Sequence, residues 1–323
     1  MIRRLLLPAT LACLLLFCGV ASAAFPERSV RIIVPFAPGG VTDLAARLLG
    51  QQLSVKWGQA VVIENRAGAG GLIGVDAAIR SPADGYTILM STNGEVVIHP
   101  AASQKPRFDP LADLIPISMV TSTPYAWLAN VKSGFNSLAE LVAEAKAKPG
   151  ALSYPSAGVG STMHLATEQF SAAAGLKMLH VPYRGGAPAA TALTSGEVPV
   201  GLVALSAVSP VVDSGNARLL AVTSATRSKM LPNVPTVNET GVLSGFQASI
   251  WTALFVPKGT PPEIVSKIQA DTLDALKDPN LLEKLAAVGT DPGNAAGSEL
   301  AERIRREIKE LSTLAKSNGI VLE

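Results

Sequence analysis

The stretch RIIVPFAPGGVTD, residues 31–43, decides how the chain begins to fold. Its apolar start predicts a short buried strand over 31–34, which the following prolines end. The glycine pair permits a tight turn, and Thr42 or Asp43 is expected to cap a helix over 42–56. Free N–H groups and the dipole at a helix start favour an anion. The turn is therefore a candidate carboxylate or phosphate site, although a turn that binds nothing fits the same pattern.

The residues before this stretch have the features of a removable export leader. Arg3 and Arg4 give a positive start, residues 5–20 are almost wholly apolar, and the small residues 21–23 form a cleavage signal. The apolar run is short for a membrane span and ends at that signal. We expect residues 1–23 to be removed and the mature protein to lie in the periplasm.

The cysteines and the charge exclude several classes of protein. Cys13 and Cys18 both lie in the leader, so the mature chain has no thiol for a disulfide, for catalysis or for a metal. A lipid anchor on Cys18 is the alternative, which the bulky Phe17 before it disfavours. Without the two leader arginines the chain has 25 basic and 25 acidic residues, which argues against a nucleic-acid-binding protein.

Short apolar runs alternate with helical patterns along the mature chain, which is typical of an α/β fold with parallel βαβ units. Ser137 is expected to cap the helix that follows it, with Glu140 completing a capping box. The strands that the pattern predicts are 31–34, 60–64, 86–90, 152–154, 179–181, 198–205 and 218–223. The predicted helices are 42–56, 71–80, 137–147, 162–174, 187–195, 261–277 and 297–317.

Two long stretches, 115–131 and 246–256, are apolar but have no helical period. They flank a central αβ block, which indicates a chain that crosses to a second lobe, folds it, and crosses back. We expect a first lobe of 24–124 plus 247–323, a second lobe of 125–246, and a ligand cleft between them.

Two further loops follow predicted strands of the first lobe. ENRAGAGGLIG, residues 64–74, does not have the glycine spacing of the dinucleotide fingerprint, and a backbone-amide nest that includes Gly70 is the better interpretation. A glycine-rich turn without a ligand is equally compatible. STNGE, residues 91–95, places Thr92 and Asn93 at the carboxyl end of a strand, where open α/β sheets bind ligands.

The predicted second lobe contains two similar candidates. SYPSAGVGSTMHL, residues 153–165, leads into a helix with Ser161 and Thr162 at its start, which is another possible anion site. Ser161 and His164 also suit a hydrolase, but the G-x-S-x-G elbow is absent. Arg184 offers a bidentate fork for a carboxylate, or a surface ion pair. The three histidines are scattered, so we expect no metal and no cofactor.

Eight motifs, taken in chain order, resemble those of the Bug-type extracytoplasmic receptors of the tripartite tricarboxylate transporter family. The resemblance spans the mature chain. The motifs are a leader, VPFAPGGVTDLAAR (34–47), ENRAGAGGLIG (64–74), SPADGYTILM (81–90), YPSAGVGSTMHLA (154–166), VPYRGGAPA (181–189), RLLAVTSATRS (218–228) and LPNVPTVNETG (231–241).

The resemblance implies a two-lobed periplasmic binding protein of type II that closes on a small carboxylate. It implies a monomer that delivers this ligand to the membrane subunits of a transporter. The ligand contacts that it implies are, in the first lobe, Phe36, Ala37, Gly39, Gly40 and Asp43, and in the second lobe, Ser156, Gly160, Ser161, Thr162 and Arg184.

The chain departs from the family pattern in the segment GEVPVGLVAL. Pro199 stands where an Asp is usual, and the pair Val203 and Ala204 stands where a Phe-Asp pair is usual. We expect the loss of an acidic group near the cleft either to reduce recognition of an ammonium group or to make the pocket more apolar, and both argue against a simple amino-acid ligand. Two other functions remain open: a module that presents its ligand to a membrane sensor kinase, and an exported enzyme that uses Ser161, His164 or Asp43.

Overall fold

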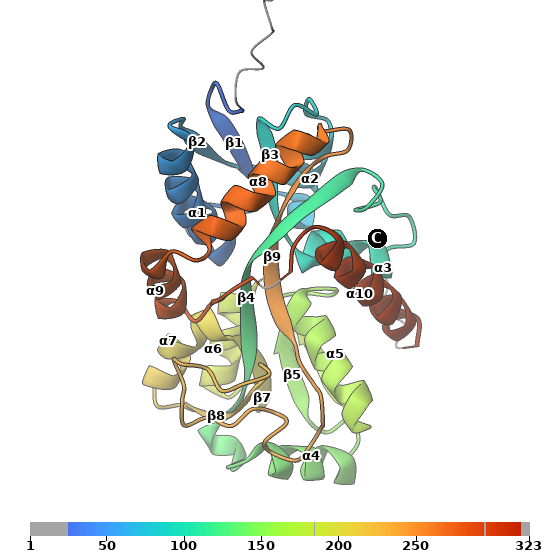
Figure 1. Ribbon diagram of the computed structural model, residues 1–323. Helices are drawn as coiled ribbons and strands as arrows, with labels where there is room; N and C mark the ends of the chain where they lie inside the picture. Colours follow the sequence, from blue (N-terminus) through green and yellow to red (C-terminus); the bar gives the residue numbers. More distant parts are fainter. Residues whose placement is uncertain (1–24, 184, 294, 318–323) are drawn as a thin grey trace, which may run out of the picture.

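The computed structural model describes residues 25–183, 185–293 and 295–317, which form two lobes, one above the other in Figure 1. The first lobe contains β1 (Val30–Val34), α1 (Val41–Trp57), β2 (Val61–Asn65), α2 (Leu72–Ile79), β3 (Thr87–Thr92), a π-helix (Gly94–Ile98), α3 (His99–Ala102), β9 (Ser249–Pro257), α8 (Pro262–Ala275), α9 (Pro279–Ala287), β10 (Asp291–Pro292) and α10 (Gly297–Ser317). The second contains α4 (Leu138–Ala147), β5 (Ser153–Ser156), α5 (Thr162–Ala174), β6 (Leu179–Pro182), α6 (Gly186–Ser195), β7 (Val200–Ala204), α7 (Val208–Asp213) and β8 (Ala217–Val222).

One strand, β4 (Leu114–Asn130), belongs to both lobes. From Leu114 to Pro124 it pairs antiparallel with β9, and from Tyr125 onward it lies between β7 and β8. The extended character predicted for 115–131 therefore corresponds to a continuous crossing strand. Because β9 returns beside it, the two lobes are joined by a pair of neighbouring strands.

The first-lobe sheet has the order β10-β4-β9-β3-β1-β2. Strand β1 is parallel to both β2 and β3, with Ile32 opposite Ile63 on one side and Ile88 on the other. The predicted parallel βαβ units are confirmed. In the second lobe, β5 and β6 form a separate parallel pair.

Alternation along the strands builds a core on each face of both sheets. Ile32 packs in the cluster beneath α1 and α8, whereas Ile33 packs in the cluster beneath α2 and α10. In the second lobe, Trp127 packs with residues of α4 and α5, and Leu128 with residues of α6 and α7. The two-lobed α/β fold with helices on both faces is confirmed. No helix among the described residues has both the length and the apolar character needed to cross a bilayer.

Two predictions of helix capping have different outcomes. Ser137 caps α4, accepting the N–H of Glu140 at 3.2 Å, as predicted. The prediction that Thr42 or Asp43 caps α1 is wrong, because α1 begins at Val41 with Gly40 as its N-cap. Gly40 has no side chain to accept a hydrogen bond, and Asp43 instead lies inside the first turn. The π-helix, α3, α7 and α9 are additional helices that the sequence pattern did not predict.

Candidate ligand-binding cleft

A large hollow of about 1180 Å³ lies between the lobes. Its first-lobe side is formed by the β1–α1 loop, the glycine-rich turn before α2, and the segment that follows β3. Its second-lobe side is formed by the β5–α5 loop, α6, and the segment from β7 to α7. Among its lining residues are Phe36, Gly40, Val41, Thr42, Gly70, Leu72, Thr92, Glu95, His99, Gly160, Ser161, Thr162, Ala187, Ala204 and Val211.

Three helices begin at this cleft. The N-caps of α1 and α5, Gly40 and Ser161, line it directly, and α6 begins there at Gly186. In α1 the first main-chain bond within the helix runs from Leu44 N to Gly40 O, so the N–H groups of the first turn, residues 41–43, have no main-chain partner in the helix. Helix starts from both lobes thus direct N–H groups and positive dipole ends toward one space, which favours an anion.

The side-chain carboxylate of Asp43 stabilises the β1–α1 loop through hydrogen bonds. Its carboxylate accepts the N–H of Gly39 at 3.0 Å, the Nε of Arg47 at 2.9 Å and the Nδ2 of Asn65 at 2.9 Å. Asn65 also donates to the carbonyl of Phe36 at 3.0 Å. Burial raises the pKa of Asp43, but the hydrogen bonds from Arg47, Gly39 and Asn65 outweigh it and hold the pKa below its usual range. Asp43 is therefore a charged scaffold for the loop.

The β5–α5 loop is held by a histidine. Ser161 Oγ accepts the N–H of His164 at 3.2 Å, and His164 Nδ1 accepts the N–H of Gly160 at 3.0 Å. Burial lowers the pKa of His164 to about 4, so its ring is neutral at pH 7 and Nδ1 is free to accept. Ser161 therefore bonds the His164 backbone and caps the helix, an arrangement that does not suit a nucleophile.

A second serine and histidine lie behind this loop. Ser156 Oγ is 2.6 Å from His180 Nε2, and the His180 ring stacks on His164 with centroids 3.8 Å apart. Ser156 is fully buried and does not line the cleft. Burial and the neighbouring His164 lower the pKa of His180 to about 4, which makes it a poor general base at neutral pH.

Glu95 lines the cleft, although in the motif STNGE the sequence pattern pointed only to Thr92 and Asn93 as ligand residues. Its Oε2 accepts hydrogen bonds from Ser91 Oγ at 2.8 Å and from the Thr92 N–H and Oγ1 at 2.9 Å. Only 3% of the residue is exposed, and burial raises the pKa of its carboxyl despite these bonds. Glu95 is the second residue of the π-helix that follows β3, and its side chain lies against Gly71 of the glycine-rich turn.

The predicted ligand residues fall into three groups. Those that line the cleft are Phe36, Gly40, Gly70, Thr92, Gly160, Ser161 and Thr162. Those outside its lining are Ala37, Gly39, Asp43, Asn93 and Ser156, of which Asp43 and Ser156 support the loops that do line it. Arg184 lies outside the described residues. Direct contact of each with a ligand stays a prediction.

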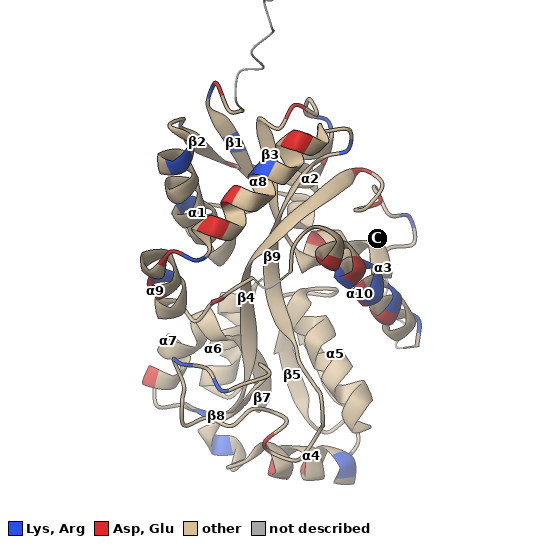
Figure 2. Ribbon diagram, viewed as in Figure 1, with Lys and Arg blue, Asp and Glu red and all other residues tan. Residues whose placement is uncertain are grey.

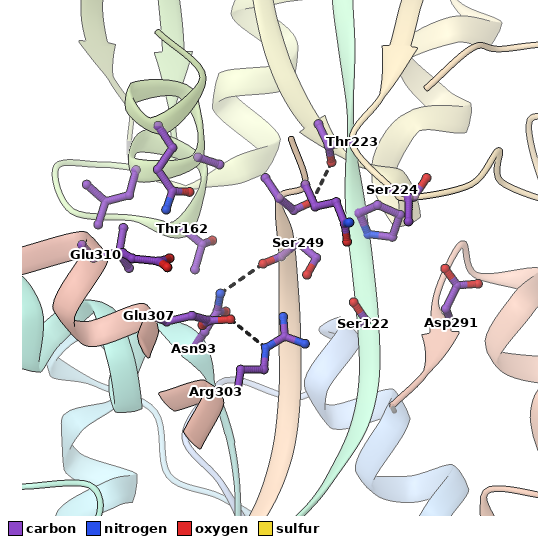
Figure 3. A pocket seen from close by; sticks show the side chains of 18 of the residues that line it. Asn93, Ser122, Thr162, Thr223, Ser224, Ser249, Asp291, Arg303, Glu307 and Glu310 are labelled. Atoms are coloured by element: carbon purple, nitrogen blue, oxygen red, sulfur yellow. Dashed lines mark hydrogen bonds and ion pairs between the residues drawn. The ribbon is translucent and has the colours of Figure 1, made fainter. Parts of the chain in front are cut away.

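Asn93 lines a second, smaller hollow of about 310 Å³, between α10, α5 and the two joining strands. Figure 3 shows Arg303 in this hollow, bound through Nε to Glu307 at 2.7 Å. Asp291 and Glu310 also line it, so its described charged side chains are three acidic groups and one arginine that is already paired. This surplus of negative charge suits a carboxylate less well than the larger cleft does.

The family model described as tripartite tricarboxylate transporter family receptor matches residues 45–320. The chain belongs to this receptor family. Bug-related proteins are also among its relatives: Protein BugT of Bordetella pertussis is 37% identical over 305 residues, which cover 94% of this chain and 93% of BugT. The resemblance drawn from the sequence motifs is confirmed.

Solved structures also share the fold of this chain. A protein of R. palustris solved with adipate has a TM-score of 0.80 and 34% identity, over 92% of this chain and 99% of that one. MatC from Rhodopseudomonas palustris, with bound malate, has a TM-score of 0.75 and 30% identity, over 90% of this chain and 99% of that one.

Proposed function

We propose that this chain is a periplasmic receptor that captures a small carboxylate between its lobes and delivers it to the membrane subunits of a tripartite tricarboxylate transporter. The observation that carries the proposal is the convergence of the starts of α1, α5 and α6, from both lobes, on one cleft. Two structural relatives contain the carboxylates adipate and malate, which supports this class of ligand.

The mechanism that we propose is closure of the lobes. A carboxylate that contacts both Gly40 of α1 and Ser161 of α5 binds the closed arrangement more tightly, because only closure brings both helix starts to it. The joining strands β4 and β9 act as the hinge, and we retain 24–124 plus 247–323 as one lobe and 125–246 as the other. The register of β4, which leaves β9 for β7 and β8 after Pro124, supports this division.

Arg184 remains a proposed contact with the ligand carboxylate. Its near neighbours in the chain, Gly186 and Ala187, line the cleft, which supports this assignment. Arg184→Ala should weaken carboxylate binding by at least tenfold if the bond is charge-assisted. Affinities that are equal for the variant and the original protein at low salt would remove Arg184 from the site.

The export leader is also part of the proposal. Residues 1–23 should be absent from the mature periplasmic protein, which should begin at Ala24. N-terminal sequencing of the exported protein tests this directly. An acylated N-terminal Cys18 would show a lipoprotein instead.

A ligand panel tests the receptor function. Malate, adipate and hexanoate are each titrated into the purified protein, with 1-hexanol as the uncharged control, and the midpoint of thermal unfolding is followed. At least one carboxylate should raise the midpoint, because it binds the folded state, while 1-hexanol should not. The bound carboxylate should be recovered unchanged by mass spectrometry. No response to any carboxylate, or conversion of one into a product, would contradict the proposal.

A further inference from the structure

Part of the cleft has a distinctly aliphatic surface. Helix α6 and the segment from β7 to α7 contribute small apolar side chains, which we call the aliphatic wall: Ala187, Ala190, Ala204, Ala207, Pro210 and Val211. Helix α6 contains no Lys, Arg, Asp or Glu along its whole length, and Figure 2 shows it without charge colour, whereas α1, α8 and α10 carry many charged side chains.

Few charged groups face the cleft. Among its described lining residues, the side chains that can carry a charge are Glu95 and His99, and neither Lys nor Arg is present. Burial, together with Arg107, lowers the pKa of His99, so it offers no positive charge at pH 7. Glu95, where ionised, repels an anion. Among its described lining residues, the cleft therefore offers helix starts to a carboxylate but no cation.

Three of the hydroxyl groups beside the aliphatic wall are already used within their own helices. Thr191 Oγ1 donates to the carbonyl of Ala187 at 3.1 Å, and Thr194 Oγ1 donates to that of Thr191 at 2.9 Å. Ser214 Oγ donates to the carbonyl of Val211 at 2.7 Å. A second polar group of a ligand would have to break one of these bonds or rely on the single hydroxyl of Ser206, which also lines this part of the cleft.

We propose that the ligand of this cleft is a monocarboxylate with a continuous apolar body, which lies against the aliphatic wall. The inference rests on the proposed function, since it assumes that the carboxylate binds at the helix starts. It also fits Ala204, which occupies a position where the sequence pattern of the family suggested an acidic residue.

The physical reason is the difference in desolvation between a methyl end and a carboxylate end. A carboxylate buried against alkyl groups loses its hydration without a compensating cation, which is strongly unfavourable. Each methylene group removed from water instead tightens binding, by up to about fourfold. The cleft volume of about 1180 Å³ leaves room for such a body.

Hexanoate and adipate provide the matched test, because they have the same carbon chain and differ by one carboxylate. Calorimetry should give hexanoate an affinity at least tenfold higher than that of adipate, and octanoate should bind more tightly than hexanoate. Adipate binding as tightly as hexanoate would overturn this inference and leave the receptor function intact. Failure of all three to bind while malate binds would also overturn this inference, whereas failure of malate as well would count against the receptor function.

A pair of variants locates the effect on the aliphatic wall. Ala207 is exposed and lines the cleft, whereas Ser209, two residues later, is exposed but is not part of the lining. Ala207→Arg should improve the affinity for adipate relative to hexanoate at least fivefold, because it supplies the missing cation. Ser209→Arg should leave the ratio unchanged. A folded Ala207→Arg protein with the original ratio would contradict the inference.

Discussion

Gly71 lies directly against the side chain of Glu95. A Cβ on Gly71 would be 2.8 Å from Glu95 Cγ and 3.0 Å from Oε1, closer than packed atoms allow. Gly71 also has φ +95°, a conformation that suits glycine. The glycine-rich turn before α2 and the segment after β3 are thus fitted to each other, and both contribute residues to the cleft.

This contact makes Gly71→Ala more harmful than an ordinary substitution at positive φ. The variant must displace a buried carboxyl as well as strain the backbone, and we expect it to lose about 2–4 kcal/mol of unfolding free energy. Gly58→Ala is the control, since Gly58 has φ +62° and nothing within 4 Å of its Cβ position. It should lose only about 1–2 kcal/mol. Chemical denaturation measures both losses. Equal losses of unfolding free energy for the two variants would show that the contact between position 71 and Glu95 has no energetic cost and would contradict the prediction.

Replacement of Glu95 by glutamine tests its buried carboxyl through pH. Because burial raises its pKa, the folded protein holds this proton more tightly than the unfolded chain does. Its contribution to stability is full below the ordinary value of about 4.5 and is lost as the pH rises above it. Glu95→Gln should therefore gain stability relative to the original protein as the pH rises above about 4.5. Glu283→Gln, at an exposed position of α9, is the control for the change of side chain.

The histidine pair behind the β5–α5 loop should make stability depend on pH in the opposite sense to Glu95. The pKa values of His164 and His180 fall to about 4 in the folded protein, from an ordinary value of 6.5. Their contribution to stability is present above pH 6.5 and is lost as the pH falls toward 4. Asparagine at position 164 keeps an acceptor near Nδ1 but does not titrate. Unfolding of His164→Asn near pH 5 should take up about one proton fewer, and an unchanged pH slope would contradict this.

Substitutions of the neighbouring residues Gly39 and Gly40 should have different effects: the first should lower stability, and the second should lower the affinity for the ligand. Gly39 has φ +89° and does not line the cleft, so Gly39→Ala should cost about 1–2 kcal/mol of stability with little change in affinity. Gly40 has φ −78°, and a Cβ there would lie 3.9 Å from the carbonyl oxygen of Ala37, an ordinary van der Waals contact. Gly40→Val should fold with a cost of about 1 kcal/mol or less yet lose at least tenfold in hexanoate affinity, because the side chain occupies the helix start. Stability is measured by denaturation and affinity by calorimetry. If Gly39→Ala lowered the affinity and Gly40→Val lowered only the stability, the ligand would not lie at the start of α1.

The sequence predicted the elements well where local signals decide them. The apolar run before Pro35 gave β1, and Ser137 with Glu140 predicted the start of α4. The start of α1 was misplaced because a glycine N-cap leaves no side-chain signal, whereas Thr42 and Asp43 are favoured caps that here lie inside the helix.

The candidate site was predictable only in part. The loops at the helix starts were found from their glycines and small polar residues, since this pattern is local. The burial of Glu95 was not, because it depends on Gly71 from a different loop. The aliphatic wall was also missed, since in a helix as rich in alanine as α6 the sequence does not distinguish cleft-facing alanines from core-facing ones.

Small-angle X-ray scattering with and without the tightest-binding carboxylate of the panel tests the central claim, that a carboxylate is held between the helix starts of two closing lobes. The radius of gyration should fall when that carboxylate is added and should not change with 1-hexanol. Gly40→Val should abolish the fall. A carboxylate that raises the midpoint of thermal unfolding but leaves the scattering curve unchanged would show binding to one lobe alone and would contradict the account.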